Sequence, residues 1–473
     1  MKILFVLPQV GSAVPSFHAV SILSAVVKQA GHETCLLEMP RMRLGAVDEA
    51  IARHDPAVVA ITSVTQQIPY SKQIIAHVKQ RYPHIYTVLG GTHAIVRPGC
   101  IDEIAGLDAL ATNESERPFV DLLSALQAGQ GPTDIPNFAF RHGGQVIRPT
   151  RTYSCTEEEM TALPFEDREL FPRWRETPKG VPLESLGIRP RFFFSRGCAF
   201  KCSFCTLPTM RKMYPEKKFV RYPTAERAIA EIESVADRWT FSTWVADDDV
   251  FTHRPDWIIN EWAAKYPDRL RHLKWEMNLR VETASEEVIR AVVATGCSLA
   301  KFGLESGDPE LRKHVYDRNI TNEQTEHVFA LCRKHGLKAH TFNILGAPDE
   351  TRGQVWQTVR MNQKLRPERV QISILVPYPG TPLGDQMERE GRILKHVDNY
   401  FSESPVKLSH LKPWEVKFYF RLFRLVVYSA YSPRLAWGEI VGLIKWLRDK
   451  LARKRTRYDL EAATTQSVEA DHS

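Results

Sequence analysis

Short apolar runs alternate with amphipathic stretches along the first 130 residues of the chain. The apolar runs have the length of buried strands and lie at residues 2–7, 33–38, 57–62, 86–91 and 108–112. Helical patterns separate most of them, as over residues 69–82. Buried strands that alternate with helices predict a doubly wound, Rossmann- or flavodoxin-like α/β domain over residues 1–130, with a parallel sheet of about five strands. Ligands of such sheets bind at the carboxyl ends of the strands.

The strand–helix alternation stops after residue 130 and resumes at residue 191. Residues 131–190 carry many prolines and few periodic runs, which predicts a linker that wraps between two domains. Residues 191–400 contain longer strand–helix units, with strands expected at residues 191–195, 241–247, 273–279, 299–305, 339–345 and 370–377. Six such units predict a partial (β/α)6 barrel of the TIM type, with its chemistry at the carboxyl ends of the strands.

The C-terminal part of the chain is predicted to be a helical region over residues 401–458, followed by a disordered tail at residues 459–473. One face of the last helix is apolar, and the residues on it are Trp437, Ile440, Val441, Ile444, Leu447 and Leu451. Lysines and arginines lie on the opposite face of this helix. Two interpretations stay open: a helix packed on the barrel with a solvated basic face, or an interfacial helix in peripheral contact with anionic lipid. The second would suit a lipid-like substrate.

Composition places the chain among folded proteins of two or three domains. Its 473 residues are 43% hydrophobic, and no apolar run reaches the roughly 18 residues that a membrane-spanning helix needs. The N-terminus lacks a cleavage site of the signal-peptide type, which predicts a cytoplasmic, reducing location. The net charge of +7 is modest, and we expect no nucleic-acid partner because no binding module accompanies it. The eight cysteines are then thiols or metal ligands rather than disulfides.

Three cysteines lie close together directly after the first expected barrel strand. Cys198, Cys202 and Cys205 have the spacing C-x3-C-x2-C, and three thiolates on a short loop can converge on one metal ion or cluster. A structural zinc site would need a fourth ligand at matched spacing, and no second C-x2-C or H-x3-H pair occurs. A four-iron cluster on three thiolates would leave one iron open for another ligand. Structural zinc and incidental thiols stay as alternatives.

This cysteine loop resembles the signature of the radical S-adenosylmethionine (radical SAM) superfamily, including the aromatic Phe204 before the last cysteine. The resemblance extends to Leu383. FGLESG at residues 302–307 is similar to the family's fourth-strand signature, and NILGAPDET at residues 343–351 to that of the fifth strand. VPYPGTPL at residues 376–383 is similar to the end of the sixth. The resemblance implies a [4Fe–4S] cluster on the three cysteines, with S-adenosylmethionine bound at the open iron.

The same resemblance implies a reaction. One electron, from a donor such as flavodoxin or ferredoxin, cleaves a carbon–sulfur bond of S-adenosylmethionine. The resulting 5′-deoxyadenosyl radical takes a hydrogen atom from the substrate. The cofactor carries this chemistry, and the barrel supplies orientation and a dry site.

The resemblance also assigns residues to the S-adenosylmethionine site. The triplet Asp247-Asp248-Asp249 ends the second strand, where acidic residues of the family contact the methionine amino group, and Asp247 and Asp248 are assigned to this contact. Glu305 would face the adenosyl group, and Asn278 and Arg280 end the third strand, where polar contacts to the cofactor often lie. Simpler roles stay open: the aspartates can cap the following helix, Glu305 can be an ion-pair partner, and GAPDE can be an ordinary turn.

The N-terminal domain resembles the cobalamin-binding domain that precedes the barrel in one large radical SAM subgroup. The similarity rests on residues 15–33, 62–67 and 90–98. Gly90 and Gly91 would let the macrocycle or its nucleotide tail approach the backbone. Ser63 and Thr65 would donate hydrogen bonds to it. A degenerate module that binds nothing, or binds a nucleotide, is the alternative.

Proteins that bind cobalamin through histidine carry a D-x-H-x-x-G pattern, whose histidine is the lower axial ligand of cobalt. The sequence of this chain departs from that pattern. The corresponding region reads SFHAVS, with His18 present but without the aspartate and the glycine. The missing aspartate would orient the imidazole. We therefore expect cobalamin with its own base displaced and no protein histidine on cobalt.

The commonest reaction in this subgroup is methylation of an unactivated carbon, here of a small-molecule or lipid-like substrate. One S-adenosylmethionine would methylate cobalt, and a second would generate the radical. A cyclase or rearrangement enzyme without methyl transfer is one alternative. A non-catalytic cobalamin or iron–sulfur sensor is another, which the strand-end motifs disfavour because a sensor needs no adenosyl site. A methylthiotransferase acting on RNA is set aside, since only Cys35 and Cys100 occur in the N-terminal domain for a second cluster.

Overall fold

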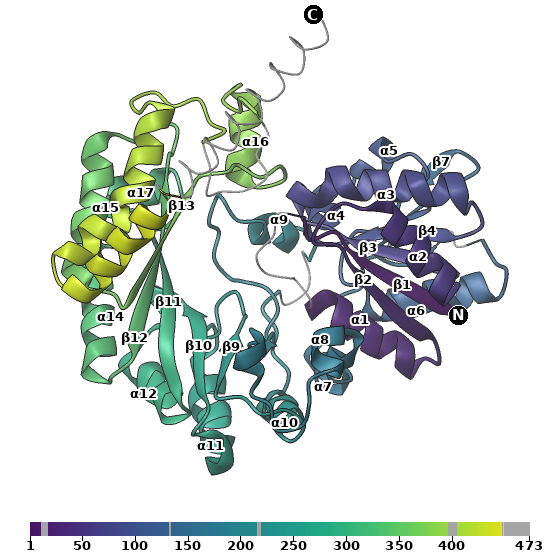
Figure 1. The fold of residues 1–473 in the computed structure, drawn as a ribbon, viewed down its shortest axis with the longest axis horizontal. Helices are drawn as coiled ribbons and strands as arrows, with labels where there is room; N and C mark the ends of the chain where they lie inside the picture. Colours follow the sequence, from purple (N-terminus) through teal and green to yellow (C-terminus); the bar gives the residue numbers. More distant parts are fainter. Residues whose placement is uncertain (11–17, 132–133, 215–218, 396–403, 447, 449–473) are drawn as a thin grey trace, which may run out of the picture.

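The computed structural model describes residues 1–10, 18–131, 134–214, 219–395, 404–446 and 448. Two α/β lobes lie side by side (Figure 1), the N-terminal lobe in purple and blue and the second lobe in teal and green. The α/β architecture that the sequence predicts for both lobes is confirmed.

The N-terminal lobe is built on one sheet with the strand order β2-β1-β3-β4-β5-β6-β7. The first five strands are parallel: β1 (Lys2–Leu7), β2 (Glu33–Glu38), β3 (Val58–Thr62), β4 (Tyr86–Gly90) and β5 (Ala109–Ala111). These are the five predicted strands, because an apolar run of five or six residues marks each buried strand of a parallel sheet.

The sheet continues beyond residue 130, into the segment expected to be a linker. β6 (Phe138–His142) and β7 (Gln145–Ile147) add an antiparallel hairpin next to β5. The ring of Phe138 stacks on those of Phe119 and Phe140, and these side chains are buried. The run FAF is short and lies in a proline-rich segment, so periodicity along the chain does not reveal it.

Helices cover both faces of this sheet. α1 (His18–Gln29) and α6 (Glu116–Gln127) pack on one face, and α2 (Leu44–His54) and α3 (Ile68–Arg81) on the other. The short helices α4 (Thr92–Val96) and α5 (Cys100–Glu103) follow β4. This doubly wound arrangement leaves the carboxyl ends of β1, β3, β4 and β5 facing the second lobe.

The segment between the lobes is packed against both of them. It contains α7 (Glu157–Ala162), η2 (Arg168–Leu170), α8 (Pro172–Arg175) and η3 (Leu183–Leu186). Asp167 accepts a hydrogen bond from Ser24 of α1 at 2.6 Å. The buried Arg168 guanidinium lies over the rings of Trp174 and Phe192. These contacts fix the segment to α1 and to the first strand of the second lobe.

The second lobe is an open sheet of six parallel strands in sequential order. They are β8 (Arg191–Phe192), β9 (Thr243–Ala246), β10 (Lys274–Leu279), β11 (Cys297–Glu305), β12 (Lys338–Leu345) and β13 (Arg369–Ile374). The prediction of a partial barrel with six strands is confirmed.

The helices of the second lobe lie mainly between its strands in the chain. They are α9 (Leu207–Arg211), α10 (Ala225–Ala236), η4 (Trp257–Trp262), α11 (Ala263–Lys265), η5 (Asp268–Leu270), η6 (Val281–Thr283), α12 (Glu286–Ala294), α13 (Pro309–His314), α14 (Asn322–Lys334), α15 (Arg352–Leu365) and α16 (Pro382–Arg389). The segments that follow β8 and β9 reach the N-terminal lobe, where they line a shared cavity.

Two further helices form the C-terminal region. α17 (Pro413–Ser429) packs on α15 and β13, and residues 433–446 form a second helix beside it. Among the described residues, no helix is long and apolar enough to cross a membrane. The tail expected at residues 459–473, together with Leu447 and Leu451, lies outside the described residues.

Candidate active site

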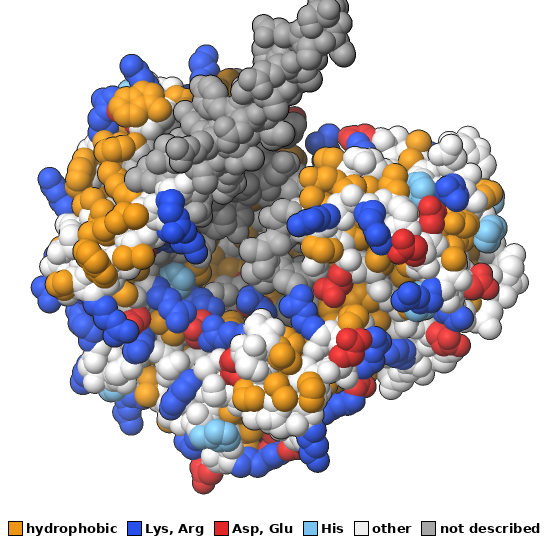
Figure 2. All heavy atoms as spheres, viewed as in Figure 1, with side chains coloured by type: hydrophobic (Ala, Val, Ile, Leu, Met, Phe, Trp, Pro, Cys, Tyr) orange, Lys and Arg blue, Asp and Glu red, His pale blue; other side chains and the backbone are white. Residues whose placement is uncertain are grey.

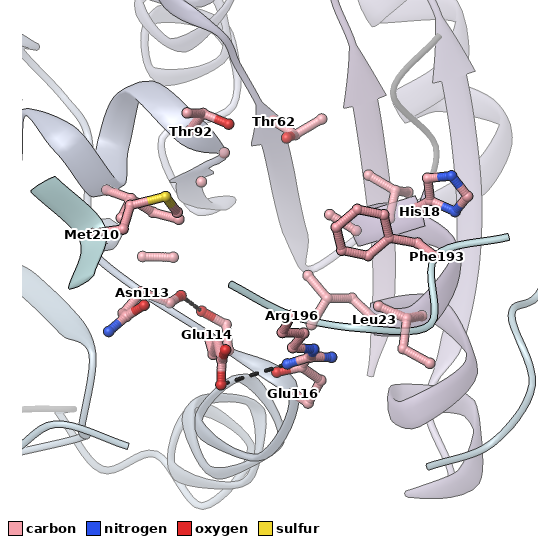
Figure 3. A pocket seen from close by; sticks show the side chains of 18 of the residues that line it. His18, Leu23, Thr62, Thr92, Asn113, Glu114, Glu116, Phe193, Arg196 and Met210 are labelled. Carbon is pink, nitrogen blue, oxygen red and sulfur yellow. Dashed lines mark hydrogen bonds and ion pairs between the residues drawn. The ribbon is translucent and has the colours of Figure 1, made fainter. Parts of the chain in front are cut away.

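A cavity of 590 Å³ lies where the two lobes meet (Figure 3). The N-terminal lobe lines it with the ends of β1, β3 and β4 and with the segment after β5. The second lobe lines it with the loop after β8 and with Asp249 after β9. Its volume is that of a ligand pocket, and the carboxyl ends of parallel strands are where both folds bind ligands.

The three cysteines of the C-x3-C-x2-C loop lie at the mouth of the barrel. Cys198 and Cys202 are buried, whereas Cys205 is half-buried and lines the cavity. Burial raises the pKa of Cys198 to about 11 and that of Cys205 to about 12, so a cation is needed to hold them as thiolates. His253 Nε2 lies 3.3 Å from Cys198 Sγ.

The thiols are not arranged as a ready-made site for a single ion. Within the part of the chain that the structure describes, no three His, Cys, Asp or Glu side chains are gathered tightly enough to hold one metal ion. Thiolates that each bind a different iron of a cluster do not need to converge on one point. The donor set, three thiols on one loop beside a cavity, fits such a cluster.

Arg280, at the end of β10, reaches the sulfur of the middle cysteine. Its Nη1 donates to Cys202 Sγ at 2.8 Å. The guanidinium lies 3.7 Å above the ring centre of Phe200, and Glu282 forms a two-point ion pair with its other edge. The guanidinium is therefore held from two sides while it points at the thiol.

The three consecutive aspartates after β9 have different surroundings. Asp247 forms a two-point ion pair with Arg191. Asp248 is fully buried and accepts hydrogen bonds from the backbone N–H and the hydroxyl of Ser195, which joins the ends of β8 and β9. Asp249 is accessible from the cavity, and removal from bulk water, with repulsion from Asp248, raises its pKa to about 7. Of the triplet, Asp249 lines the cavity, whereas Asp247 and Asp248, which the sequence interpretation assigned to S-adenosylmethionine, are bonded to the protein.

The other two residues assigned to the S-adenosylmethionine site have protein partners. Asn278 Nδ2 donates to the backbone oxygen of Asp248 at 2.8 Å. Glu305 is buried at φ +60° and forms an ion pair with Arg318. A Cβ at Gly303 would collide with both members of this pair. The FGLESG segment thus builds a buried ion pair, which is one of the two roles that the sequence leaves open for Glu305.

The hydroxyl residues selected in the N-terminal lobe differ in position. Ser63 lines the cavity, and its hydroxyl shares a hydrogen bond with Ser71 of α3. Thr65 turns away, and its Oγ1 lies 3.0 Å from His93 Nδ1. Ser63 alone of the two is placed to meet a ligand in the cavity.

The two glycines after β4 have separate roles. Gly91 has φ +96°, and a Cβ there would lie 2.5 Å from the backbone oxygen of Ser63, so it is needed for close packing of the loops after β3 and β4. A Cβ at Gly90 would touch only Ala111, at 3.6 Å. Gly90 lines the cavity, and the space that its missing side chain leaves in the wall is called the slot.

His18 bridges the N-terminal lobe, the connecting segment and the second lobe. Its Nδ1 lies 2.7 Å from Glu166 and its Nε2 3.1 Å from Asp247. Burial alone would lower the pKa of His18, but these two carboxylates raise it to about 9. The imidazolium then donates from both nitrogens, and neither is available as a metal ligand in this state.

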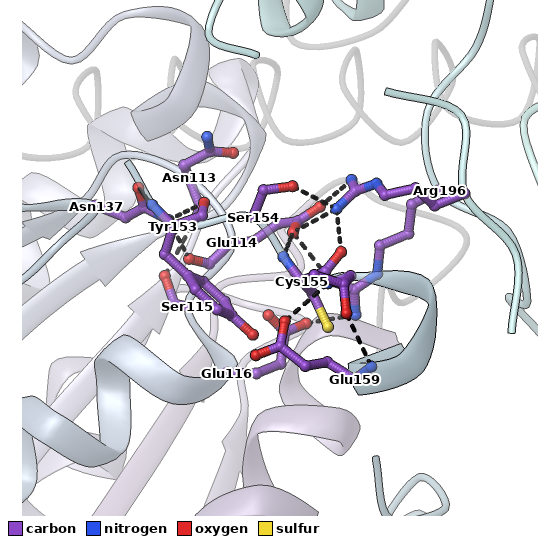
Figure 4. A network of polar contacts seen from close by, with 12 residues as sticks. Asn113, Glu114, Ser115, Glu116, Asn137, Tyr153, Ser154, Cys155, Glu159 and Arg196 are labelled. Atoms are coloured by element: carbon purple, nitrogen blue, oxygen red, sulfur yellow. Dashed lines mark hydrogen bonds and ion pairs between the residues drawn. The ribbon is translucent and has the colours of Figure 1, made fainter. Parts of the chain in front are cut away.

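A second group of charges also joins the lobes (Figure 4). Arg196, two residues before the first cysteine, forms ion pairs with Glu116 at 2.5 Å and with Glu114 at 3.5 Å. Arg221 forms a two-point ion pair with Glu114. The sequence interpretation missed these residues. Two glutamates directly after a predicted buried strand are the signal that could have indicated them.

Two family models match the chain, one in each lobe. Residues 9–123 match the B12 binding domain, and residues 192–361 match the radical SAM superfamily. The chain belongs to the cobalamin-binding radical SAM enzymes. Its cofactors are accordingly a [4Fe–4S] cluster, S-adenosylmethionine and cobalamin.

Relatives of this radical SAM enzyme include several methyltransferases. An uncharacterised methyltransferase of Pyrococcus horikoshii is 27% identical over 91% of this chain and 92% of its own. The hopanoid C-3 methylase of Methylococcus capsulatus is 23% identical over 92% of this chain and 80% of its own. The anaerobic magnesium-protoporphyrin IX monomethyl ester cyclase of Rubrivivax gelatinosus is 24% identical over 72% of this chain and 61% of its own.

Solved structures share the fold of the cobalamin domain and the barrel together. The radical S-adenosylmethionine methyltransferase TsrM from Kitasatospora setae has a TM-score of 0.66 at 18% identity, covering 91% of this chain and 89% of TsrM. The cobalamin-dependent radical enzyme OxsB has a TM-score of 0.69 at 12% identity, covering 94% of this chain and 71% of OxsB.

Proposed function

We propose that this radical SAM enzyme methylates an unactivated carbon of a small-molecule or lipid-like substrate. One observation carries the proposal: the cysteine loop and the strand ends of the cobalamin domain line the same cavity. A methyl group carried on one cofactor and a hydrogen atom removed by the other must meet at a single substrate carbon. A shared cavity meets that requirement, and the methyltransferases among the relatives support it.

The chain's own residues have distinct roles in this proposal. Cys198, Cys202 and Cys205 would hold the cluster, and Asp249 would bind the amino group of S-adenosylmethionine. Ser63 and the slot at Gly90 would accept cobalamin. When bound, the cluster and S-adenosylmethionine supply the 5′-deoxyadenosyl radical, and cobalamin supplies the methyl carrier. A flavodoxin or ferredoxin as the electron donor and a cytoplasmic location belong to the same proposal.

Apolar side chains also line the cavity, and their function would be to exclude water. Phe193, Phe194 and Met210 line its barrel side, and Leu7 and Phe119 line the opposite side. Such walls exclude water, which protects a reactive carbon radical from side reactions. Asp248 and Asn278 would act indirectly, because they hold the ends of the strands that carry the catalytic loops.

Methyl-labelled S-adenosylmethionine tests the reaction type. The reconstituted enzyme, with a reductant and an extract of the host's small molecules and lipids, is expected to transfer the label to a product. A product that forms without label would exclude methyl transfer. Equal labelling in the Asp249→Asn variant would exclude the role proposed for that carboxylate.

Ring formation or rearrangement without methyl transfer is the second candidate, favoured by the cyclase among the relatives. The same experiment separates the two reactions. A cyclase would consume substrate and form 5′-deoxyadenosine, while all of the methyl label would stay in S-adenosylmethionine and methionine.

A further inference from the structure

The helix at residues 433–446 turns its apolar stripe outward. Trp437 is 65% exposed and Ile444 is 59% exposed, and Val441 between them is also exposed. The helix packs instead through Leu435 and Ala436, which join the core formed with α17 and β13. The interpretation of this stripe as the face packed on the barrel is therefore wrong.

α17 also carries exposed apolar side chains. Its Trp414 is 62% exposed, and Phe418, one turn further on, is also exposed. The two helices lie side by side: the Arg421 guanidinium is 4.0 Å from the ring centre of Trp446, and Arg424 forms an ion pair with Glu439 at 3.1 Å. We call Trp414, Phe418, Trp437, Val441 and Ile444 the C-terminal apolar face.

Positive charge surrounds this face. Residues 404–448 contain two glutamates, and both are in ion pairs, Glu415 with Arg352 and Glu439 with Arg424. The same span contains eight basic residues: Lys407, Lys412, Lys417, Arg421, Arg424, Arg434, Lys445 and Arg448. Figure 2 shows hydrophobic side chains gathered over α15 and α17, with lysines and arginines at their edge.

We propose that the C-terminal apolar face docks on an anionic lipid membrane, with its two helices lying in the plane of the interface. Exposed tryptophans set among lysines and arginines are typical of helices that insert shallowly between head groups. A protein partner is less suited to this surface, because protein interfaces are depleted in lysine. The positive charge instead complements acidic head groups, which attract lysines and arginines close to the surface.

Vesicle co-sedimentation of the full chain tests the proposal. The wild type is expected to sediment with vesicles of phosphatidylcholine and phosphatidylglycerol, to bind phosphatidylcholine alone much more weakly, and to dissociate as salt is added. A Trp437→Gln/Ile444→Gln variant should bind roughly tenfold more weakly. The matched control, Phe165→Gln/Leu186→Gln, changes two exposed apolar residues elsewhere and should bind like the wild type.

Two charge-reversal variants test the electrostatic part of the proposal. Arg434→Glu/Lys445→Glu should reduce binding to the anionic vesicles, whereas Arg43→Glu/Arg53→Glu on the N-terminal lobe should not. The eight substituted positions are all exposed, so circular dichroism should be unchanged.

Three results would overturn the proposal. Equal binding of the wild type and the Trp437→Gln/Ile444→Gln variant would assign lipid contact to another part of the chain. Failure of the wild type to bind acidic vesicles would exclude a membrane. A dimer that the same substitutions dissociate, measured by light scattering, would assign this face to a second copy of the chain. Each result is independent of methyl transfer, which is measured in solution.

Discussion

The two lobes meet the shared cavity with different kinds of surface. The cobalamin domain contributes small residues, among them Gly90 and Ala111, beside apolar side chains such as Leu7. The barrel presents groups that carry chemistry, including Cys205 and the carboxylate of Asp249. In the proposed function, the first surface would accommodate cobalamin, and the second would bind the smaller charged groups of the cluster and S-adenosylmethionine.

The difference extends to the groups behind each surface. In the barrel, Arg280 is held by Phe200 and Glu282 so that it points at Cys202. In the cobalamin domain, Gly91 is required because the loops after β3 and β4 approach closely. Changes in the barrel should therefore alter the cluster and leave the cobalamin site intact. Changes in the N-terminal loops should do the reverse.

Cys202→Ala should have the largest effect, on both cluster assembly and 5′-deoxyadenosine formation. With one ligand removed, the cluster should not assemble, and 5′-deoxyadenosine formation should fall to background because no electron reaches S-adenosylmethionine. Cobalamin should still bind, since its surface lies on the other lobe. Iron content, 5′-deoxyadenosine yield and the corrinoid absorption spectrum measure the three outcomes.

The control for this variant is Cys332→Ala, which removes a buried thiol of the barrel far along the chain from the cysteine loop. It should keep its iron. If the wild type made no more 5′-deoxyadenosine than Cys202→Ala, the chain would be a sensor rather than an enzyme of this type. Loss of cobalamin from Cys202→Ala would show that the two surfaces are not independent.

Gly91→Ala should affect the cobalamin domain rather than the barrel. The new Cβ meets the backbone of Ser63, and the residue keeps a positive φ, so the lobe should lose about 1–3 kcal/mol of stability. Cobalamin affinity should fall while iron content stays unchanged. The neighbouring Gly90→Ala should fold normally, because its Cβ makes only an ordinary contact, and should weaken cobalamin binding by narrowing the slot. Unchanged affinity in both variants would contradict the assignment of this wall.

The sequence predicts much of the fold because most strands are marked by their own residues. The five parallel strands of the first lobe and the six of the second lie where apolar runs indicate them. The hairpin of β6 and β7 is the exception, since the FAF run of β6 becomes recognisable as a strand only through pairing with β5 and stacking on Phe119. Local periodicity cannot show a strand whose burial depends on distant partners.

The candidate site is only partly predictable from the sequence, for a related physical reason. The cysteine spacing is local, and it identifies the loop directly. Which of three adjacent aspartates faces the cavity depends on the partners that Arg191 and Ser195 provide from β8 and the loop after it. The contact between Arg280 and Cys202 likewise joins β10 to a loop 78 residues away.

Arg280→Gln should change the cluster without removing it. A guanidinium that donates to a thiolate stabilises the more negative, reduced cluster, so its loss should lower the midpoint potential. A difference of 1.4 kcal/mol between the redox states corresponds to about 60 mV for a one-electron couple, which sets the scale. Potentiometric titration followed by electron paramagnetic resonance, without S-adenosylmethionine present, measures the shift.

Two variants sharpen the result for Arg280. Arg280→Lys keeps the charge but loses the planar contact with Phe200 and Glu282, and should recover only part of the potential. Glu282→Gln should move the potential by less, because the guanidinium stays stacked on Phe200. An unchanged potential in Arg280→Gln, together with weaker binding of S-adenosylmethionine, would place Arg280 in the substrate site instead.

His18 lies at the junction between the two lobes, and His18→Gln should have the smallest effect, which is measured as a change in melting temperature. The ordinary pKa of histidine is about 6.5, and Glu166 and Asp247 raise that of His18 to about 9. The ion pairs therefore stabilise the folded chain fully below about pH 6.5, and this contribution is lost as the pH rises through 9. The variant should melt a few degrees below the wild type at about pH 6 and close to it at about pH 10.

The pH dependence distinguishes this junction from a surface ion pair. The Arg168 and Arg191 guanidiniums also contact the same carboxylates and keep them ionised across this range, so the proton lost near pH 9 is that of His18. His314→Gln removes a histidine from an exposed ion pair with Glu310 and should give no measurable difference at either pH. A His18→Gln deficit that persists undiminished at about pH 10 would show that His18 contributes through packing against Phe193 rather than through its charge.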